Sequence, residues 1–264
     1  MDMIKLGDVT LHYRIEGDAD GLPIVFANSL GTDFRLWDKV IPLLPDGLRI
    51  LRFDKRGHGL SSCPDGDYAI DDLIADTARL LQALEIRDCL FVGLSIGGLI
   101  AQGLAAGHKD LVKAMVISNS AARIGTVEMW RQRIDSLHRG GIEALADNIM
   151  ERWFSSDFRQ HSTLELLAWR NMLTRTPLQG YIGCCAAISA CDFEQSNLEL
   201  NLPTLVIAGE EDGSTPPDLV RATAAMIAGS QFELIDNAAH LPCVEQPVVY
   251  ARILGKFIRE NSYA

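Results

Sequence analysis

The chain has 264 residues, of which 48% are hydrophobic and 22% charged, a composition that allows a large packed core and excludes a disordered chain. Its net charge of −11 argues against nucleic-acid partners, which require a basic surface. No apolar run reaches the roughly 18 residues that a membrane-spanning helix needs, and residues 1–5 lack the basic region and apolar core of a signal peptide. We therefore expect a cytoplasmic protein without a membrane partner, and a homo-oligomer is compatible with these features.

The cysteines do not form a metal-binding pattern; they lie at positions 63, 89, 184, 185, 191 and 243. None belongs to a C-x-x-C pair accompanied by histidines, which is the spacing typical of zinc sites. A chain without a signal peptide is expected to keep its thiols reduced. We therefore predict no metal site and treat the cysteines as free thiols.

Short apolar runs rich in β-forming residues alternate with amphipathic stretches along most of the chain. The runs predict strands over residues 9–15, 23–27, 48–53, 89–94, 114–118, 204–208 and 232–235. Helical patterns cover residues 70–84, 96–106, 218–228 and 247–259. Strands that alternate with helices indicate an α/β fold with a mostly parallel central sheet and helices on both faces.

Residues 123–193 interrupt this alternation. They contain no convincing strand, and their apolar residues follow a helical spacing. The segment holds eight arginines, no lysine and eight acidic residues, so the rest of the chain carries the whole net charge of −11. It also holds three of the four tryptophans. We predict a helical cap subdomain over residues 123–193, inserted into an α/β core made of residues 1–122 and 194–264.

A candidate nucleophile lies in residues 93–97, Gly-Leu-Ser-Ile-Gly, which match the G-x-S-x-G motif. The motif follows a predicted strand and precedes a predicted helix, which is its context in α/β-hydrolases. The tight turn would strain the backbone of Ser95 and expose its hydroxyl at a helix N-terminus, where a developing anion is favoured. The structural alternative is a Gly-Ser turn without chemistry; the strand–helix context favours the nucleophile.

His240 is the predicted base, because a serine hydroxyl needs a neighbouring base to take its proton. In α/β-hydrolases the order along the chain is serine, acid, histidine. Of the six histidines, only His240 follows the last predicted strand. His58 lies in an Arg-Gly-His-Gly turn, where a structural hydrogen bond explains it better.

Asp212 is the predicted acid, whose task is to accept the Nδ1–H of the base and to stabilise the imidazolium. It follows the predicted strand over 204–208 and precedes His240 by 28 residues. Glu210 and Glu211 are rivals in the same loop, and a solvated acidic loop is the structural alternative. The other place where this fold can hold the acid follows the strand over 114–118; it carries Asn119 and no carboxylate, which favours Asp212.

Two backbone N–H groups are expected to receive the oxyanion that forms when a serine attacks a carbonyl. One belongs to the residue after the nucleophile, Ile96. The other comes from the loop after the strand over 23–27, where the position is that of Leu30.

Stretches distributed over nearly the whole chain form a combination that is more particular than these motifs. They are residues 28–32 (NSLGT), 37–38 (WD), 54–61 (DKRGHGLS), 93–98 (GLSIGG), 151–154 (ERWF), 183–188 (GCCAAI), 209–216 (GEEDGSTP) and 239–242 (AHLP). Together they resemble the 3-oxoadipate enol-lactonases, α/β-hydrolases of the β-ketoadipate pathway for aromatic catabolism. The NSLGT and GCCAA stretches are more particular to the enol-lactonases, whereas the triad and Arg-Gly-His-Gly motifs are shared by many α/β-hydrolases.

The resemblance implies hydrolysis of 3-oxoadipate enol-lactone, a small anionic lactone, to 3-oxoadipate. Ser95 would attack the lactone carbonyl, and a tethered acyl-enzyme would then be hydrolysed by a water that His240 activates. The reaction requires no metal and no organic cofactor.

The substrate anion needs a cationic partner, for which a bidentate arginine is best suited. Arg131 and Arg133 in the predicted cap are the candidates, with Arg152 less favoured, and Trp130 and Trp153 could line the pocket. The structural alternative is that these arginines pair with acids on the surface and that the tryptophans pack the cap against the core.

Two rival functions remain open at this stage. The same motifs occur in other carboxylesterases, in cofactor-free perhydrolases of the haloperoxidase type and in carbon–carbon bond hydrolases. A non-catalytic sensor built on the same fold is disfavoured by the complete set of serine, histidine and aspartate.

Overall fold

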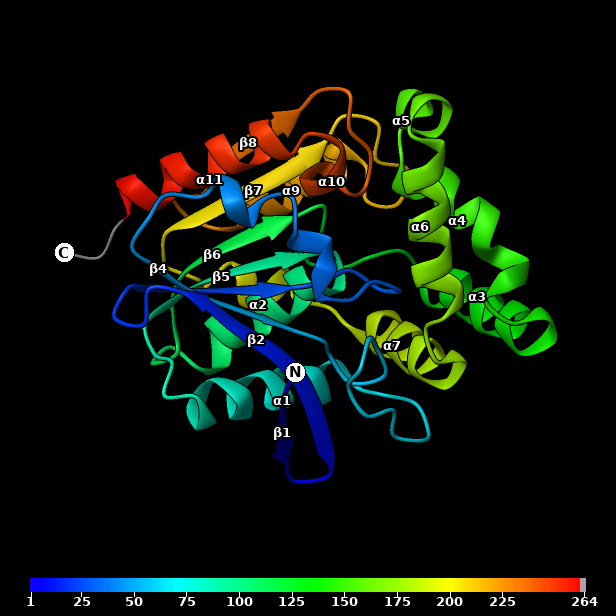
Figure 1. Cartoon of the computed structure of the whole chain (residues 1–264), viewed down its shortest axis with the longest axis horizontal. Helices are drawn as coiled ribbons and strands as arrows, with labels where there is room; N and C mark the ends of the chain where they lie inside the picture. Colours follow the sequence, from blue (N-terminus) through cyan, green and yellow to red (C-terminus); the bar gives the residue numbers. More distant parts are fainter. Residues whose placement is uncertain (262–264) are drawn as a thin grey trace.

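An eight-stranded sheet lies at the centre of the computed structural model, which describes residues 1–261 (Figure 1). The strands have the spatial order β1-β2-β4-β3-β5-β6-β7-β8. Pairs β1–β2 and β2–β4 are antiparallel, and all other neighbours are parallel, so the predicted mostly parallel sheet is confirmed. The bounds of the strands are Asp2–Leu6 (β1), Val9–Gly17 (β2), Leu22–Ala27 (β3), Leu48–Phe53 (β4), Cys89–Leu94 (β5), Val112–Ser118 (β6), Thr204–Gly209 (β7) and Gln231–Ile235 (β8).

Strand β1 is missing from the sequence prediction, because its residues do not form an apolar run. Leu6 is the one buried residue of the strand. The strand pairs with β2 at the edge of the sheet, where one partner strand is enough to hold it. The seven predicted strands all exist, with ends shifted by at most two residues.

Helices cover both faces of the sheet, as predicted from the alternation. On one face α1 (Ile70–Ala83) packs against α2 (Ile96–Gly107). The short helix α8 (Glu194–Asn197) contacts both α2 and α9 (Pro217–Met226). On the other face α11 (Pro247–Glu260) packs with α10 (Pro242–Glu245) and the short 3-10 helices η1 (Phe34–Trp37) and η2 (Ile41–Leu43). Figure 1 shows α1 and α11 on opposite sides of the strands.

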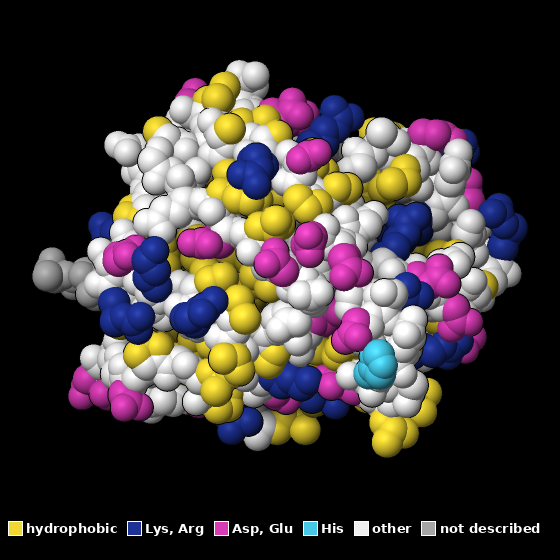
Figure 2. Space-filling model, turned by 90° about the horizontal axis from the view of Figure 1, so that it is seen from above, with side chains coloured by type: hydrophobic (Ala, Val, Ile, Leu, Met, Phe, Trp, Pro, Cys, Tyr) yellow, Lys and Arg dark blue, Asp and Glu magenta, His cyan; other side chains and the backbone are white. Residues whose placement is uncertain are grey.

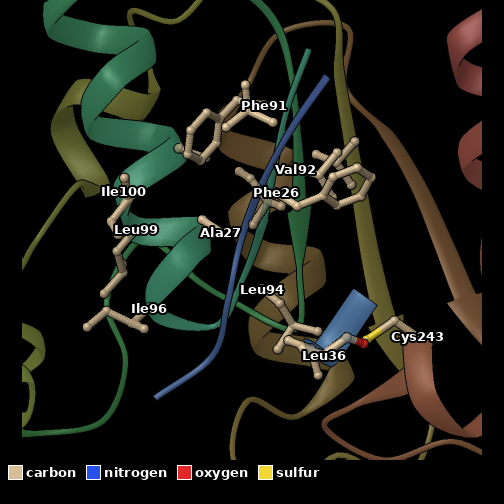
Figure 3. Close-up of a cluster of buried hydrophobic side chains, with 14 of the residues drawn as sticks. Phe26, Ala27, Leu36, Phe91, Val92, Leu94, Ile96, Leu99, Ile100 and Cys243 are labelled. Atoms are coloured by element: carbon tan, nitrogen blue, oxygen red, sulfur yellow. The ribbon is translucent and has the colours of Figure 1, made fainter. Parts of the chain in front are cut away.

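Helix α2 is buried, as its small and apolar composition indicates. Its side chains pack beneath β5, all six residues of which are buried. Figure 3 shows Ile96, Leu99 and Ile100 of this helix near Phe91 and other apolar side chains of the sheet. Each large apolar side chain buried in this way contributes on the order of 2 kcal/mol, so the position of α2 under the sheet is strongly fixed.

The segment between β6 and β7 is helical. Figure 1 shows its helices α3–α6 beyond the ends of the strands. This part of the chain contains α3 (Val127–Gly140), η3 (Glu143–Leu145), α4 (Ala146–Trp153), α5 (Ser156–His161), α6 (Thr163–Thr174), α7 (Leu178–Ala190) and α8. The helical character expected for residues 123–193 therefore agrees with the structure, whereas the subdomain boundaries stay a prediction.

The surface mixes charges of both signs. Figure 2 shows basic and acidic side chains interspersed on the face that it presents. Within residues 1–261, no helix is long and apolar enough to cross a membrane. The same residues hold no group of three or more His, Cys, Asp or Glu side chains placed to bind a metal ion.

Candidate active site

Ser95 occupies a strained turn between β5 and α2. Strand β5 ends at Leu94 and α2 begins at Ile96, so a single residue makes the turn. Its backbone has φ 58° and ψ −118°, a region that residues with a side chain rarely adopt. The flanking glycines are needed for this turn: a Cβ at Gly93 would overlap the carbonyl of Gly97, and one at Gly97 would overlap the carbonyl of Ala27. The predicted strand–serine–helix context is confirmed.

Hydrogen bonds from the end of β6 hold this strained backbone. The N–H of Ser95 donates to the carbonyl of Ser118 at 2.9 Å. The carbonyl of Ser95 accepts from the hydroxyl of Ser120 at 2.7 Å and from the N–H of Gly98 at 2.8 Å. Because the N–H and the carbonyl of the residue are both held, the strained backbone persists in the folded state.

His240 and Asp212 form a buried pair. Asp212 lies in the loop after β7 and His240 in the loop after β8. The Nδ1–H of His240 donates to Oδ2 of Asp212 at 2.8 Å, and the side chains are 4% and 0% exposed. This bond fixes the tautomer, so Nε2 of His240 is left as the acceptor on the other edge of the ring. His240 lines the same pocket as Ser95.

The Asp212 carboxylate is surrounded by donors. The N–H groups of Ser214 and Thr215 donate to Oδ1 at 2.7 and 3.0 Å, and the Thr215 hydroxyl donates to Oδ2 at 2.7 Å. Burial raises the pKa of Asp212, but the charge and hydrogen bond of His240, with the bonds from Asn119 and Thr215, lower it below the usual value. Asp212 is therefore held as an anion, which suits a group that stabilises an imidazolium.

Asn119 is a site residue that the sequence analysis does not identify. Its Nδ2 donates to Oδ2 of Asp212 at 2.8 Å and to the carbonyl of Ala239, next to His240, at 3.1 Å. The sequence feature that could have identified Asn119 is its position directly after β6, which is the alternative place for the acid in this fold. The rivals Glu210 and Glu211 are exposed in the structure.

The loop after β3 is held by hydrogen bonds that leave the N–H of Leu30 facing away from Lys55. The carbonyl of Ser29 accepts from the buried Nζ of Lys55 at 2.7 Å. In a trans peptide the next N–H points the opposite way, and the structure contains no cis bond within residues 1–261. The N–H of Gly31 is occupied by Nε2 of His58 at 2.8 Å. The Leu30 N–H is thus the donor of this loop that faces the side opposite to Lys55, and Leu30 lines the pocket with Ser95.

His58 has the structural role expected from its Arg-Gly-His-Gly turn. Because Nε2 accepts from Gly31, the ring proton is on Nδ1, which faces the carbonyl of Arg56 at 3.3 Å. Burial, helped by the charge of Lys55, lowers the pKa of His58 well below its usual value. The ring is therefore a neutral acceptor that holds the loop. Burial also lowers the pKa of Lys55, to about 8.

The second predicted N–H belongs to Ile96, the first residue of α2. The first N–H groups of a helix have no partner inside that helix. Leu30 lies in the loop after β3, and Ile96 directly follows Ser95. An oxyanion hole formed by their two N–H groups stays a prediction.

One pocket brings these groups together with residues of α3, α4 and α7. The helical region contributes Met129, Trp130, Arg133, Ile149, Arg152, Trp153, Tyr181 and Ile188. The core side contributes Ser29, Leu30, Ser95, Ser214, Thr215 and His240, and Ile124 lies in the segment between β6 and α3. The pocket therefore joins apolar walls, two guanidinium groups and the predicted nucleophile and base, Ser95 and His240.

Arg131 does not line this pocket, so the prediction that it contacts the substrate is corrected. Its side chain is 62% exposed and bonds Glu128 and Asp135 on its own helix. Trp130 and Arg133 are three residues apart and share a helical face, whereas Arg131 points away from it. The guanidinium of Arg133 lies over the Trp130 ring, 5.2 Å from its centre. Arg152, the less favoured candidate, lines the pocket.

Comparisons with known proteins agree with this architecture. Residues 23–247 match the family model described as alpha/beta hydrolase fold. 3-oxoadipate enol-lactonase 2 of Acinetobacter baylyi is 33% identical over 94% of this chain and 93% of its own length. The crystal structure of the enol-lactonase from Burkholderia xenovorans superposes with a TM-score of 0.95, at 35% identity over 98% of this chain and all of that one. A hydrolase from Pseudomonas aeruginosa gives a TM-score of 0.93 at 32% identity over 97% of each chain. The chain therefore belongs to the α/β-hydrolase family of ester hydrolases and is related to the 3-oxoadipate enol-lactonases along almost its whole length.

Proposed function

We propose that this protein hydrolyses 3-oxoadipate enol-lactone to 3-oxoadipate in the catabolism of aromatic compounds. The observation that carries the proposal is the pocket itself, which Ser95, His240, Arg133 and Arg152 line together. A serine and a histidine suit attack on an ester carbonyl, and guanidinium groups in the same pocket suit a substrate that carries a carboxylate. The relatives from Acinetobacter baylyi and Burkholderia xenovorans are, by their names, enol-lactonases.

In the first half of the reaction, Ser95 Oγ attacks the lactone carbonyl while Nε2 of His240 takes the hydroxyl proton. The oxyanion is received by the N–H groups of Leu30 and Ile96. When the intermediate collapses, the ring C–O bond breaks and the enol oxygen leaves, receiving the proton from His240. The enol then becomes the ketone, and the acyl group stays on Ser95.

In the second half, His240 takes a proton from a water that attacks the acyl-enzyme, and Ser95 recovers its proton as the product leaves. Asp212 stays ionised throughout and stabilises the imidazolium at each step. Its lowered pKa supports this assignment, because a neutral carboxyl could not supply that charge.

Arg133 and Arg152 are the groups proposed to bind the substrate carboxylate. Within residues 1–261 neither of them forms an ion pair, whereas Arg131 pairs with two acids. An unpaired guanidinium beside an apolar pocket is available for a ligand anion. In a chain of net charge −11 such local cations matter, because distant acidic groups are screened beyond about 8–10 Å.

The test compares the enol-lactone with a neutral ester, p-nitrophenyl acetate, as substrates of the purified protein. We expect kcat/KM to favour the enol-lactone by orders of magnitude. A preference for the simple ester would replace this proposal with a general esterase or perhydrolase function on the same three residues.

A further inference from the structure

The hydroxyl of Ser29 is not used by the mechanism above, although the residue lines the same pocket as Ser95. Ser29 is 1% exposed and lines the pocket with Leu30 and Ser95. Its Oγ is buried and has no hydrogen-bond partner within residues 1–261. A buried hydroxyl without a partner is costly, so its presence at a pocket wall points to a ligand atom as the partner.

We propose that the Ser29 hydroxyl is a third donor of the oxyanion hole, beside the N–H groups of Leu30 and Ile96. This inference rests on the proposed function, because it requires an oxyanion formed at Ser95. The hydroxyl and the Leu30 N–H belong to adjacent residues, so a substrate oxygen that reaches one lies near the other. The O–H donates a hydrogen bond to the oxyanion while the negative charge develops, and it rotates away when the charge is lost. No proton is transferred in this step.

The backbone of Ser29 is held firmly enough for this role. Its carbonyl accepts from Lys55 Nζ at 2.7 Å, from the hydroxyl of Thr32 at 3.0 Å and from the N–H of Thr32 at 3.3 Å. The preceding residue is fixed as well, since Nδ2 of Asn28 donates to the carbonyl of Phe53 at 3.0 Å. With the backbone fixed on one side, the hydroxyl only rotates about its own bonds, which is the preorganisation that electrostatic stabilisation requires.

The experiment measures kcat and KM for the enol-lactone and for p-nitrophenyl acetate in Ser29→Ala and Ser29→Cys. Loss of one oxyanion donor is expected to lower kcat on the order of 10²-fold with little change in KM, for both esters. The cysteine variant should fall between the wild type and the alanine variant, because a thiol is a weak donor. A boronic acid, which forms a tetrahedral adduct on Ser95, should lose affinity by the same factor as kcat.

A matched control is Ser196→Ala, whose hydroxyl bonds the carbonyl of Phe193 outside the pocket, and it should leave both constants unchanged. Thermal unfolding of every variant separates a misfolded chain from a loss of chemistry. A Ser29→Ala protein that keeps wild-type kcat, or that changes only KM, overturns the inference. Failure of the proposed function is a different result: Ser95→Ala would then remain active, or the simple ester would be preferred.

Discussion

Glu245 accepts two hydrogen bonds from Ser155, one from its N–H at 2.9 Å and one from its hydroxyl at 2.6 Å. The other carboxylate oxygen accepts from the N–H of Ala239 at 2.7 Å, the residue before His240. Burial raises the pKa of Glu245, although these hydrogen bonds oppose the rise. One carboxylate therefore ties the loop of the base to the segment that follows α4.

A second bond on the other side of His240 reinforces this connection: the N–H of Leu241 donates to the carbonyl of Trp153 at 3.2 Å. In Glu245→Gln an NH2 group replaces one of the two oxygens that now accept hydrogen bonds. One of the bonded N–H groups therefore loses its acceptor. We expect kcat to fall about 10- to 100-fold, because the base shifts relative to Ser95. Steady-state kinetics on the enol-lactone measure this fall in kcat.

Glu211→Gln is the control for this variant, because Glu211 is exposed in the neighbouring loop. Urea unfolding should show a loss of about 1–3 kcal/mol for Glu245→Gln and none for the control. Unchanged kcat together with lowered stability would mean that Glu245 only supports the fold and does not position His240.

The sheet, most helices and the three catalytic candidates follow from local sequence patterns. Strand β5, Ser95 and α2 are contiguous, and the glycines around Ser95 report the tight turn directly. The positions of Asp212 and His240 follow from chain order within this fold. The turn depends on neighbouring residues and the chain order on the fold class, so the sequence alone predicts both.

The supporting residues depend on contacts between distant segments, and no local pattern encodes such contacts. Asn119 meets Asp212 across 93 residues, and Ser155 meets Glu245 across 90. Arg131 and Arg133 can be told apart as pocket residues only when the face of α3 that turns toward the core is known. Trp130 marked that face in the sequence, yet only the packed helix shows that it is the pocket side.

Ser95→Ala tests catalysis against ligand sensing. Removing the nucleophile is expected to lower kcat on the order of 10⁴- to 10⁶-fold, because the residues of a triad act as a unit. Asp212→Asn should cost on the order of 10⁴-fold, since the amide favours the wrong tautomer of His240. Stopped-flow or single-turnover assays cover this range. Activity that survives Ser95→Ala would refute the site assignment.

Lys55 gives the protein a pH-dependent stability. Burial lowers its pKa to about 8 in the folded chain, from an ordinary value of 10.5. Between these values the unfolded chain binds the proton that the folded chain has released, so the free energy of unfolding rises with pH. From pH 8 to 10.5 the wild type should gain about 1–3 kcal/mol relative to Lys55→Met, which lacks the group.

Urea unfolding at both pH values measures this difference. Lys113→Met is the control, because its side chain is 51% exposed and its removal should leave the pH dependence of the wild type intact. Parallel curves for the wild type and Lys55→Met would contradict the assignment of a buried, easily deprotonated amine behind the Leu30 loop.

Arg133→Met tests the carboxylate contact, with Arg131→Met as its matched control two positions away on the same helix. Methionine keeps an apolar body over the Trp130 ring and removes the charge. We expect kcat/KM for the anionic lactone to fall about 10- to 100-fold, the range for a hydrogen bond to a charged group, while p-nitrophenyl acetate is turned over as before. Arg131→Met should leave both substrates unaffected, because that side chain is exposed and paired with Glu128.

Arg152→Met and the double variant with Arg133→Met decide whether both guanidinium groups meet one carboxylate. Two groups that share one anion give non-additive losses, whereas separate contacts give losses that add. Equal losses for the lactone and the neutral ester would instead mean that the arginines shape the pocket. The anion would then have another partner. A selective loss for the lactone links the charge of these side chains to the charge of the substrate, which geometry alone does not do.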